Sequence, residues 1–495
     1  MHRSAARRLL AATALGLALA APASASAFDL GFNDEELGAY AGVGGWQKPE
    51  LAKLDAGLLN GQQAGAKTWR LMIRWNYVAR PSGATAPNPA TLAADPAWPG
   101  YDWTAYDNYL RSIAAHGMTP ILWIAKAPTW AEGANRPPTS QTVPAGTWKP
   151  DPAALRQFAQ ALARRYDGTY PDPANPGRAL PRVGTFMGWN EPNLYSDLTP
   201  QWEKAGGRYR IASVSRYRDL QNSAYLGVKA AQPTAVVLSA GSAPFGGLSP
   251  ADPRIQPARF WRELLCVKKS SKGKLTGSKK CPKLRIDGWA HQPYPIGPPT
   301  RTARNADDVT VPDLEKLTAI IAAARKAKTV SASAAKNVWI TELSWESQPD
   351  PNGLSLEAHA QYMAGAFYQL WKDGAKHVIW WNMRDNPKGT DWNVSLQSGI
   401  FLRGAEPAAD VRKPSWTAFH FPFTAYRSRG TATLWTLPPV AGDVTVEAQT
   451  TTGWKPVATL KRKSDGTAWK TLRVGPRVTL RARVADQTSL TWKTR

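Results

Sequence analysis

Two glutamates stand at corresponding places in the sequence, each directly after a short apolar run. Glu191 lies in the segment Met187-Gly-Trp-Asn-Glu-Pro-Asn193, and Glu342 lies in Val338-Trp-Ile-Thr-Glu-Leu-Ser344. Two carboxyl groups that face each other can divide the work of breaking a bond. A protonated carboxyl gives its proton to the leaving oxygen, and an ionised one attacks the carbon. Cleavage of a glycosidic bond needs such a pair, roughly 5–5.5 Å apart where the sugar configuration is retained.

Eight apolar runs, each followed by a helical pattern, are the elements expected to position these glutamates. They lie near 37–44, 68–74, 118–125, 183–190, 235–241, 284–291, 337–342 and 377–382. Several of them are continuously hydrophobic, which is typical of parallel strands covered on both faces. Eight strand–helix units predict an α/β protein with a TIM (β/α)8 barrel, whose active sites lie at the C-terminal strand ends.

Helix signals between the runs agree with this pattern. We expect helices over 102–116, 151–166, 312–328 and 355–372, because their apolar residues recur at helical spacing. The second begins with Asp151-Pro152, a capping residue followed by proline at the first helical position. A doubly wound open sheet is the alternative fold. Such a sheet would normally carry a glycine-rich phosphate turn after its first strand, and 42–45 matches that turn poorly.

The pattern changes after residue 428. Short alternating runs separated by turn residues follow, which predicts a small C-terminal all-β sandwich domain. The expected organisation is therefore a signal peptide at 1–27, a barrel at 28–428 and the β-sandwich at 429–495.

The N-terminal segment has the order of a secretory signal peptide. Arginines precede an apolar run over 9–21, and small residues lead to an expected cleavage after Ala27. We therefore expect a secreted protein, with an uncleaved anchor as the alternative. In a secreted protein Cys266 and Cys281, which are its two cysteines, are expected to form a disulfide around a polar, lysine-rich loop. Two free thiols are the alternative.

The residues around both glutamates resemble clan A of the glycoside hydrolases, the "4/7" retaining barrels. The resemblance rests on Trp-Asn-Glu-Pro-Asn at 189–193 and Thr-Glu at 341–342. Further matching segments lie at 65–78, 287–294, 377–382 and 413–419, so that the resemblance covers about residues 28–426. Families 5 and 39 are the nearest in pattern, and the motifs do not choose between them. Asn-Glu-Pro by itself is also compatible with the first turn of a helix.

The resemblance implies a role for each matching residue. Glu191 is implied to be the acid/base and Glu342 the nucleophile. The implied substrate-binding residues are Asn190, Arg70, His291, Tyr294 and Trp381.

Four of these binding residues have defined partners in the resemblance. Asn190 is implied to contact the sugar 2-hydroxyl, Arg70 to support the nucleophile and Tyr294 to hold Glu342 by a hydrogen bond. His291 is implied to line the same subsite, and a structural histidine is the alternative.

Three positions leave a choice between neighbours. Arg74 competes with Arg70 and Glu346 with Glu342. At the eighth strand Trp380 or Trp381 faces the cleft, and Trp381 is favoured because it is nearer the strand tip.

Other chemistries find no support in the sequence. It contains no Gly-x-Ser-x-Gly nucleophile turn, zinc-ligand spacing, calcium loop or phosphate loop, so we expect neither a metal nor a cofactor. The expected activity is hydrolysis of O-glycosyl bonds in a polysaccharide or oligosaccharide. A non-catalytic carbohydrate- or wall-binding protein on a decayed barrel is the alternative. The sugar, the linkage, endo or exo action and the oligomeric state stay open.

The net charge of +25 suggests an anionic partner, and its distribution limits which kind. Residues 266–285 hold seven lysines and one arginine without an acidic residue, and 431–495 hold eleven basic and four acidic residues. The rest of the barrel is only mildly basic. For a secreted protein we expect no nucleic-acid partner. Two basic segments suggest association with an anionic cell wall, and simple solvated charge is the alternative.

Overall fold

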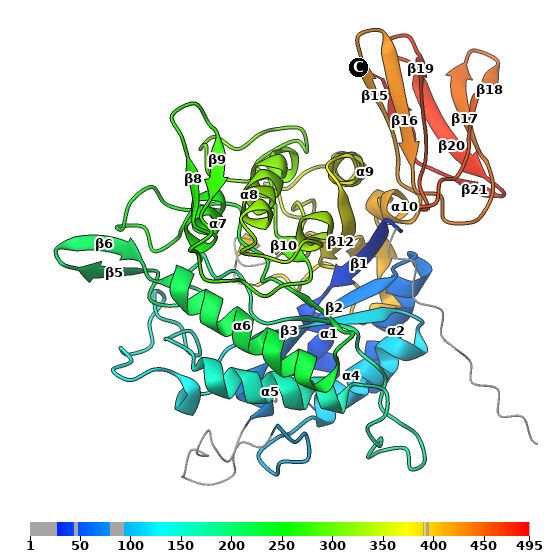
Figure 1. The fold of residues 1–495 in the computed structure, drawn as a ribbon. Helices are drawn as coiled ribbons and strands as arrows, with labels where there is room; N and C mark the ends of the chain where they lie inside the picture. The colour runs from blue at the N-terminus through cyan, green and yellow to red at the C-terminus, as the bar shows by residue number, and fades with distance from the viewer. Residues whose placement is uncertain (1–26, 44–47, 80–93, 390, 393–395, 495) are drawn as a thin grey trace, which may run out of the picture.

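The computed structural model describes residues 27–43, 48–79, 94–389, 391–392 and 396–494 (Figure 1). The predicted signal peptide lies outside these residues except for Ala27. Within the described part of the chain, no helix combines the length and apolarity needed to cross a membrane.

Eight parallel strands form the central sheet, in the order β10-β11-β12-β1-β2-β3-β4-β7. They are β1 (Asp29–Asn33), β2 (Thr68–Arg74), β3 (Thr119–Ala125), β4 (Thr185–Met187), β7 (Val236–Leu238), β10 (Trp289–His291), β11 (Val338–Ile340) and β12 (Ala375–Trp381). Parallel bridges from Leu238 to Gly288 and from Ser242 to His291 join the two outer strands. These bridges close the sheet, so the predicted TIM barrel is confirmed, and the open doubly wound sheet is wrong.

The first strand lies earlier in the chain than expected. The run near 37–44 is not a strand: it contains α1 (Glu35–Tyr40), and β1 precedes it. Asp34 caps this helix, because its side chain accepts a hydrogen bond from the backbone N–H of Leu37 at 3.2 Å. Leu37 then packs over Gly57, where a Cβ atom would meet its side chain. The buried apolar residues of this run thus belong to a helix, and the other seven predicted strands overlap observed ones.

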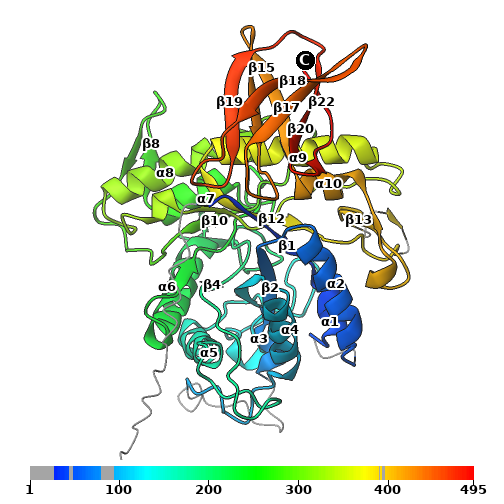
Figure 2. The same cartoon turned by 90° about the vertical axis from the view of Figure 1, so that its right-hand side faces the viewer.

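Helices surround the barrel on its outer face (Figures 1 and 2). They are α2 (Leu51–Gln63), α3 (Trp75–Val78), α4 (Thr104–Ala115), α5 (Pro152–Arg165), α6 (Ser213–Ala231), α7 (Pro257–Leu264), α8 (Glu315–Lys326), α9 (Leu356–Lys372) and α10 (Pro414–His420). All four predicted helices are confirmed. The side chain of Asp151 accepts from Ala153 N at 2.8 Å, and that of Ser355 accepts from Ala358 N at 3.2 Å. The expected helix at 312–328 is divided into a 3-10 turn at Val311–Asp313 and α8.

Three two-stranded hairpins leave the barrel. They are β5 (Trp202–Ala205) with β6 (Arg208–Ile211), β8 (Val267–Lys269) with β9 (Leu275–Gly277), and β13 (Phe401–Leu402) with β14 (Val411–Arg412). Inside the barrel a separate apolar cluster fills the space between the strands, and its buried members are Ile121, Trp123, Ala125, Met187, Leu238, Ala290, Trp339 and Ile379. This packed interior makes the strands a rigid support for residues at their C-terminal ends.

Two antiparallel sheets form the C-terminal region, as the fold prediction expected. One contains β15 (Phe423–Ser428), β16 (Thr431–Thr436) and β19 (Ala468–Arg473). The other contains β17 (Val444–Thr450), β18 (Gly453–Leu460), β20 (Thr479–Val484), β21 (Gln487–Thr488) and β22 (Trp492–Lys493). Because β15 pairs with β16, the sheets begin before residue 429.

The C-terminal sheets pack on α9 (Figure 2). The contacts include the stacking of Tyr368 on Tyr426 at 5.0 Å and a hydrogen bond from Trp371 Nε1 to Asp465 Oδ2 at 2.9 Å. The β-domain is therefore attached to the barrel through aromatic and hydrogen-bonding contacts.

The predicted disulfide between Cys266 and Cys281 is confirmed. It brackets the β8–β9 hairpin, and within the described residues no cysteine is free. The bridge closes the lysine-rich loop, whose strands β8 and β9 pack against α7 and α8.

Replacing both cysteines by serine is expected to lower the free energy of unfolding by about 3 kcal/mol, because the unfolded chain gains the entropy of an open loop of this length. Urea unfolding measures this difference. Reductant should destabilise the wild type by a similar amount and leave the double variant unchanged. A double variant as stable as the wild type under oxidising conditions would contradict the expectation.

Candidate active site

The two glutamates singled out in the sequence follow strands on one side of the barrel. Glu191 follows β4 and Glu342 follows β11, with β7 and β10 between these strands in the sheet order. Because parallel strands end on the same face of a barrel, both side chains belong to one rim. Arg70 joins them in one site, because it hydrogen-bonds both to Glu342 and to Asn190, the residue before Glu191. Repulsion between the two carboxyl groups contributes to the raised pKa of Glu191.

Arg70 is the centre of the hydrogen-bond network at this rim. Its side chain is fully buried, and its Nη1 lies 2.5 Å from Glu342 Oε1. Nη1 also donates to Asn33 Oδ1 at 3.2 Å, and Nη2 donates to Asn190 Oδ1 at 2.9 Å. The guanidinium lies 4.4 Å from the ring centre of Trp123 inside the barrel. Arg70, rather than Arg74, therefore pairs with Glu342.

Gln292 is a member of this network that the sequence reasoning missed. Its Nε2 donates to Asn190 Oδ1 at 2.9 Å and to Glu342 Oε1 at 2.8 Å. It lies directly after β10, between His291 and Tyr294, so its place at a strand tip was the available signal. Tyr294 donates from its hydroxyl to Glu342 Oε2 at 3.0 Å. Each carboxylate oxygen of Glu342 therefore accepts at least one hydrogen bond, which fixes the orientation of the side chain.

The surroundings of the two glutamates favour different protonation states. Burial raises the pKa of Glu342, and this is opposed by the charge and hydrogen bond of Arg70 and by the hydrogen bond from Tyr294. The pKa of Glu191 lies well above its ordinary value, because of burial and of repulsion by Glu342 and Asp197. The pKa of Glu191 is thus raised further than that of Glu342, which favours ionisation of Glu342 before Glu191.

The backbone at Glu191 is strained. Its φ angle is +25°, a value that residues with a side chain rarely adopt. Its N–H donates to Gly241 O at 3.0 Å, which holds the segment against the loop after β7. The residues that follow form turns, so the helix N-terminus that Asn-Glu-Pro could also indicate is wrong. Strain of this kind is common where a side chain must be aimed at a site.

His291 takes a structural position. It is fully buried, its Nε2 donates to Val309 O at 3.0 Å, and its Nδ1 accepts from the Ser242 hydroxyl at 2.9 Å. Burial lowers the pKa of His291 to about 4, so the ring is neutral. Both ring nitrogens are used within the protein. This geometry favours the structural alternative over the subsite role that the resemblance implied.

Trp380 and Trp381 differ in burial as the strand alternation requires. Trp380 is fully buried and donates from Nε1 to Ser398 O at 2.7 Å. Trp381 is half-buried at the end of β12. The more accessible ring is therefore the one that the sequence favoured.

Glu346, the alternative to Glu342, lies apart from the Arg70 network. Burial and the neighbouring Asp350 raise the pKa of Glu346 to about 7.

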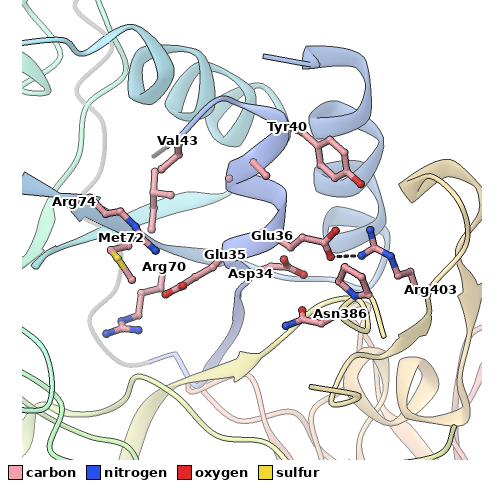
Figure 3. A pocket seen from close by; sticks show the side chains of 14 residues that line it. Asp34, Glu35, Glu36, Tyr40, Val43, Arg70, Met72, Arg74, Asn386 and Arg403 are labelled. Atoms are coloured by element: carbon pink, nitrogen blue, oxygen red, sulfur yellow. Dashed lines mark hydrogen bonds and ion pairs between the residues drawn. The ribbon is translucent and has the colours of Figure 1, made fainter. Parts of the chain in front are cut away.

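A cavity of about 510 Å³ adjoins this network (Figure 3). Its lining includes Arg70 and Arg74 of β2, residues of α1, and Asn386 and Pro387 of the loop after β12. Glu35 of α1 is an acidic residue in this lining that the sequence reasoning did not single out. It lies in the segment that was expected to lead into the first strand, which hid its place at a strand tip.

The described residues contain no candidate metal site. No three or more of their histidine, cysteine, aspartate or glutamate side chains are grouped so that they could hold an ion.

The fold and the site together define a TIM barrel with a pair of unlike carboxyl groups at its strand tips. No family model matches the sequence, and no curated protein matches it. Among solved structures the chain is similar to family 39 glycoside hydrolases, three of which are described here. The one from Bacteroides cellulosilyticus WH2 has a TM-score of 0.49 and 16% identity, covering 91% of this chain and 80% of that one.

The other two are equally distant. A family 39 β-xylosidase from Caulobacter crescentus has a TM-score of 0.49 and 17% identity, with 87% and 84% of the two chains covered. A family 39 enzyme from Xanthomonas axonopodis pv. citri has a TM-score of 0.49 and 14% identity, with 92% and 93% covered. At such low identity, function has to be argued from the site.

Proposed function

We propose that the protein is a secreted retaining glycoside hydrolase that cleaves O-glycosidic bonds of a polysaccharide or oligosaccharide by double displacement. The observation that carries this proposal is the unequal pair of carboxyl groups. Arg70 and Tyr294 donate hydrogen bonds that favour the ionised form of Glu342, whereas burial and charge repulsion raise the pKa of Glu191 well above its ordinary value. A nucleophile and a proton donor are needed together for this reaction.

In the first step an oxygen of Glu342 attacks the anomeric carbon. The bond to the leaving oxygen breaks, and Glu191 gives that oxygen its proton. The product is a glycosyl ester on Glu342. Asn190 and Gln292 are hydrogen-bonded to the same network, so their amide groups can orient the sugar next to the attacked carbon.

In the second step Glu191, now ionised, takes a proton from a water molecule. That water attacks the anomeric carbon, the ester bond to Glu342 breaks, and the sugar leaves with its original configuration. Trp381 offers an accessible aromatic face on which a sugar ring can stack.

Secretion is supported by the basic, apolar and small-residue order of residues 1–27 and agrees with the disulfide. The lysine-rich loop of the disulfide and the basic C-terminal domain would favour contact with an anionic cell wall.

Labelling with mechanism-based inhibitors tests the proposal. The mature protein is incubated with fluorinated glycosides of several sugar configurations, and the labelled peptide is identified by mass. A covalent sugar on Glu342 is the expected result. No label with any configuration, together with retained polysaccharide binding, would favour the non-catalytic binding protein.

Replacing Tyr294 by phenylalanine is expected to shift the acidic limb of the kcat/KM profile upward by about one pH unit. The hydroxyl stabilises ionised Glu342, and loss of a hydrogen bond to a charged group is worth about 1.5 kcal/mol. Without it Glu342 becomes protonated at a higher pH. The profile of wild type and variant on one aryl glycoside measures the shift, and an unchanged limb would argue against this contact.

A further inference from the structure

Glu35 is an acidic residue in the cavity that the two-step reaction does not use. It is the first residue of α1, directly after Asn33 and Asp34 at the end of β1. Its carboxyl group points into the cavity toward Arg70 and Arg74 (Figure 3). With the other described residues it forms neither a hydrogen bond nor an ion pair.

The neighbouring acidic residues of α1 are already engaged. Asp34 caps the helix and accepts from the backbone N–H groups of Met383 and Arg384, each at 3.2 Å. Glu36 is paired with Arg403, as the dashed line in Figure 3 marks. Of the three acidic residues in this lining, Glu35 alone is left to bind something in the cavity.

Glu35 shares the cavity lining with Arg70, which pairs with Glu342. Burial among the cavity walls raises its pKa to about 7; the charges of Arg74 and Arg70 oppose this rise, and Glu342 adds to it. The side chain stays accessible from the cavity itself. A carboxyl group that is surrounded by protein but open to a cavity gains from a ligand that supplies the missing hydrogen bonds.

The cavity lies on the side of the site where the cleaved sugar is expected. Its lining comes from the ends of β1 and β2 and from the loop after β12. Glu191, the proposed proton donor to the leaving oxygen, follows β4, which lies beyond β3 in the sheet order. The leaving group therefore lies toward β4, and the sugar that becomes bonded to Glu342 lies toward Glu35.

We propose that Glu35 is a substrate-binding residue that selects a neutral sugar by accepting hydrogen bonds from two adjacent ring hydroxyls. This inference rests on the glycosidase function proposed above. A carboxylate can accept from two neighbouring hydroxyls at once. Arg74, from the next strand, offers donors to the same hydroxyl oxygens. A uronic acid in this position would bring its carboxylate next to Glu35, and like charges in such a cavity repel.

The test compares wild type with Glu35→Gln on a panel of aryl glycosides and uronides, and on mono-deoxy forms of the best substrate. We expect kcat/KM of the variant to fall about 10- to 100-fold on the best substrate. A mono-deoxy substrate that lacks one of the contacted hydroxyls should lower kcat/KM of the wild type by a similar factor. The same deoxy substrate should change kcat/KM of the variant little. Glu357→Gln is the matched control, since it also removes an exposed acid from the first turn of a helix, in α9.

The outcomes distinguish failure of this inference from failure of the proposed function. The role of Glu35 would be overturned if Glu35→Gln and wild type had equal kcat/KM on the best substrate. It would also be overturned if the mono-deoxy substrates lowered kcat/KM by the same factor in both proteins. A uronide as the best substrate would overturn it as well, with the glycosidase function intact. Covalent labelling of Glu342 in Glu35→Gln shows that the variant is folded, and failure to label the wild type would count against the function itself.

Discussion

Glu342→Gln is expected to reduce hydrolysis by roughly 10⁴-fold or more, because it removes the proposed nucleophile and substitutes a side chain of nearly the same size. The amide cannot form the glycosyl ester, so labelling by the fluorinated glycosides should disappear too. Initial rates on an activated aryl glycoside, with peptide mass analysis, measure both effects.

Glu346→Gln is the control for this substitution. Glu346 lies on the same loop after β11 but outside the Arg70 network, so the variant should keep activity within a few-fold of wild type and should still be labelled. If Glu346→Gln lost most of its activity and Glu342→Gln stayed near normal, Glu346 rather than Glu342 would be the nucleophile.

Glu191→Ala is expected to slow cleavage of substrates with poor leaving groups by about 10²- to 10⁴-fold, the usual contribution of a positioned acid. Substrates with good leaving groups need no proton in the first step, so they should be affected much less. Azide can replace the water that Glu191 activates, and the glycosyl azide should form with retained configuration. Absence of any rescue by azide would show that Glu191 is not the acid/base.

The same variant has a pH signature. In the wild type, kcat/KM should fall at low pH as Glu342 becomes protonated and at high pH as Glu191 loses its proton. Because the pKa of Glu191 is raised well above its usual value, the optimum is expected to extend toward neutral pH. Glu191→Ala should lose the alkaline limb and keep the acidic one. Glu203→Gln, on the β5–β6 hairpin, is the control and should keep both limbs.

The fold was predictable because its signals are local. Continuous apolar runs, helical spacing and capping residues such as Asp151 and Ser355 each depend on a few neighbouring residues. The first strand was misplaced for the same reason. Leu37 belongs to a short apolar run that fits a strand as well as a helix. In the structure this run is helical, and Leu37 packs against Gly57 of α2, a contact that the local pattern does not contain.

The site was predictable where a motif carries it. Glu191 and Glu342 stand out by their neighbours in the sequence, and Arg70 by its strand. Gln292 and Glu35 carry no motif, and their place in the site depends on which strand tips meet. His291 is a residue that the motif suggested and the structure does not support as a subsite residue. Both of its ring nitrogens are hydrogen-bonded within the protein, to Ser242 and to Val309.

Patterns in consecutive residues were sufficient to predict the barrel, the C-terminal β-domain and the disulfide, and to single out Glu191 and Glu342 as candidates. The choice of Arg70 over Arg74 as the partner of Glu342, the burial of Trp380 and the position of Glu35 in the cavity lining were resolved by the packing of the folded chain. These outcomes depend on residues far apart in the chain meeting at one rim. There, burial and neighbouring charges set which carboxyl group holds a proton.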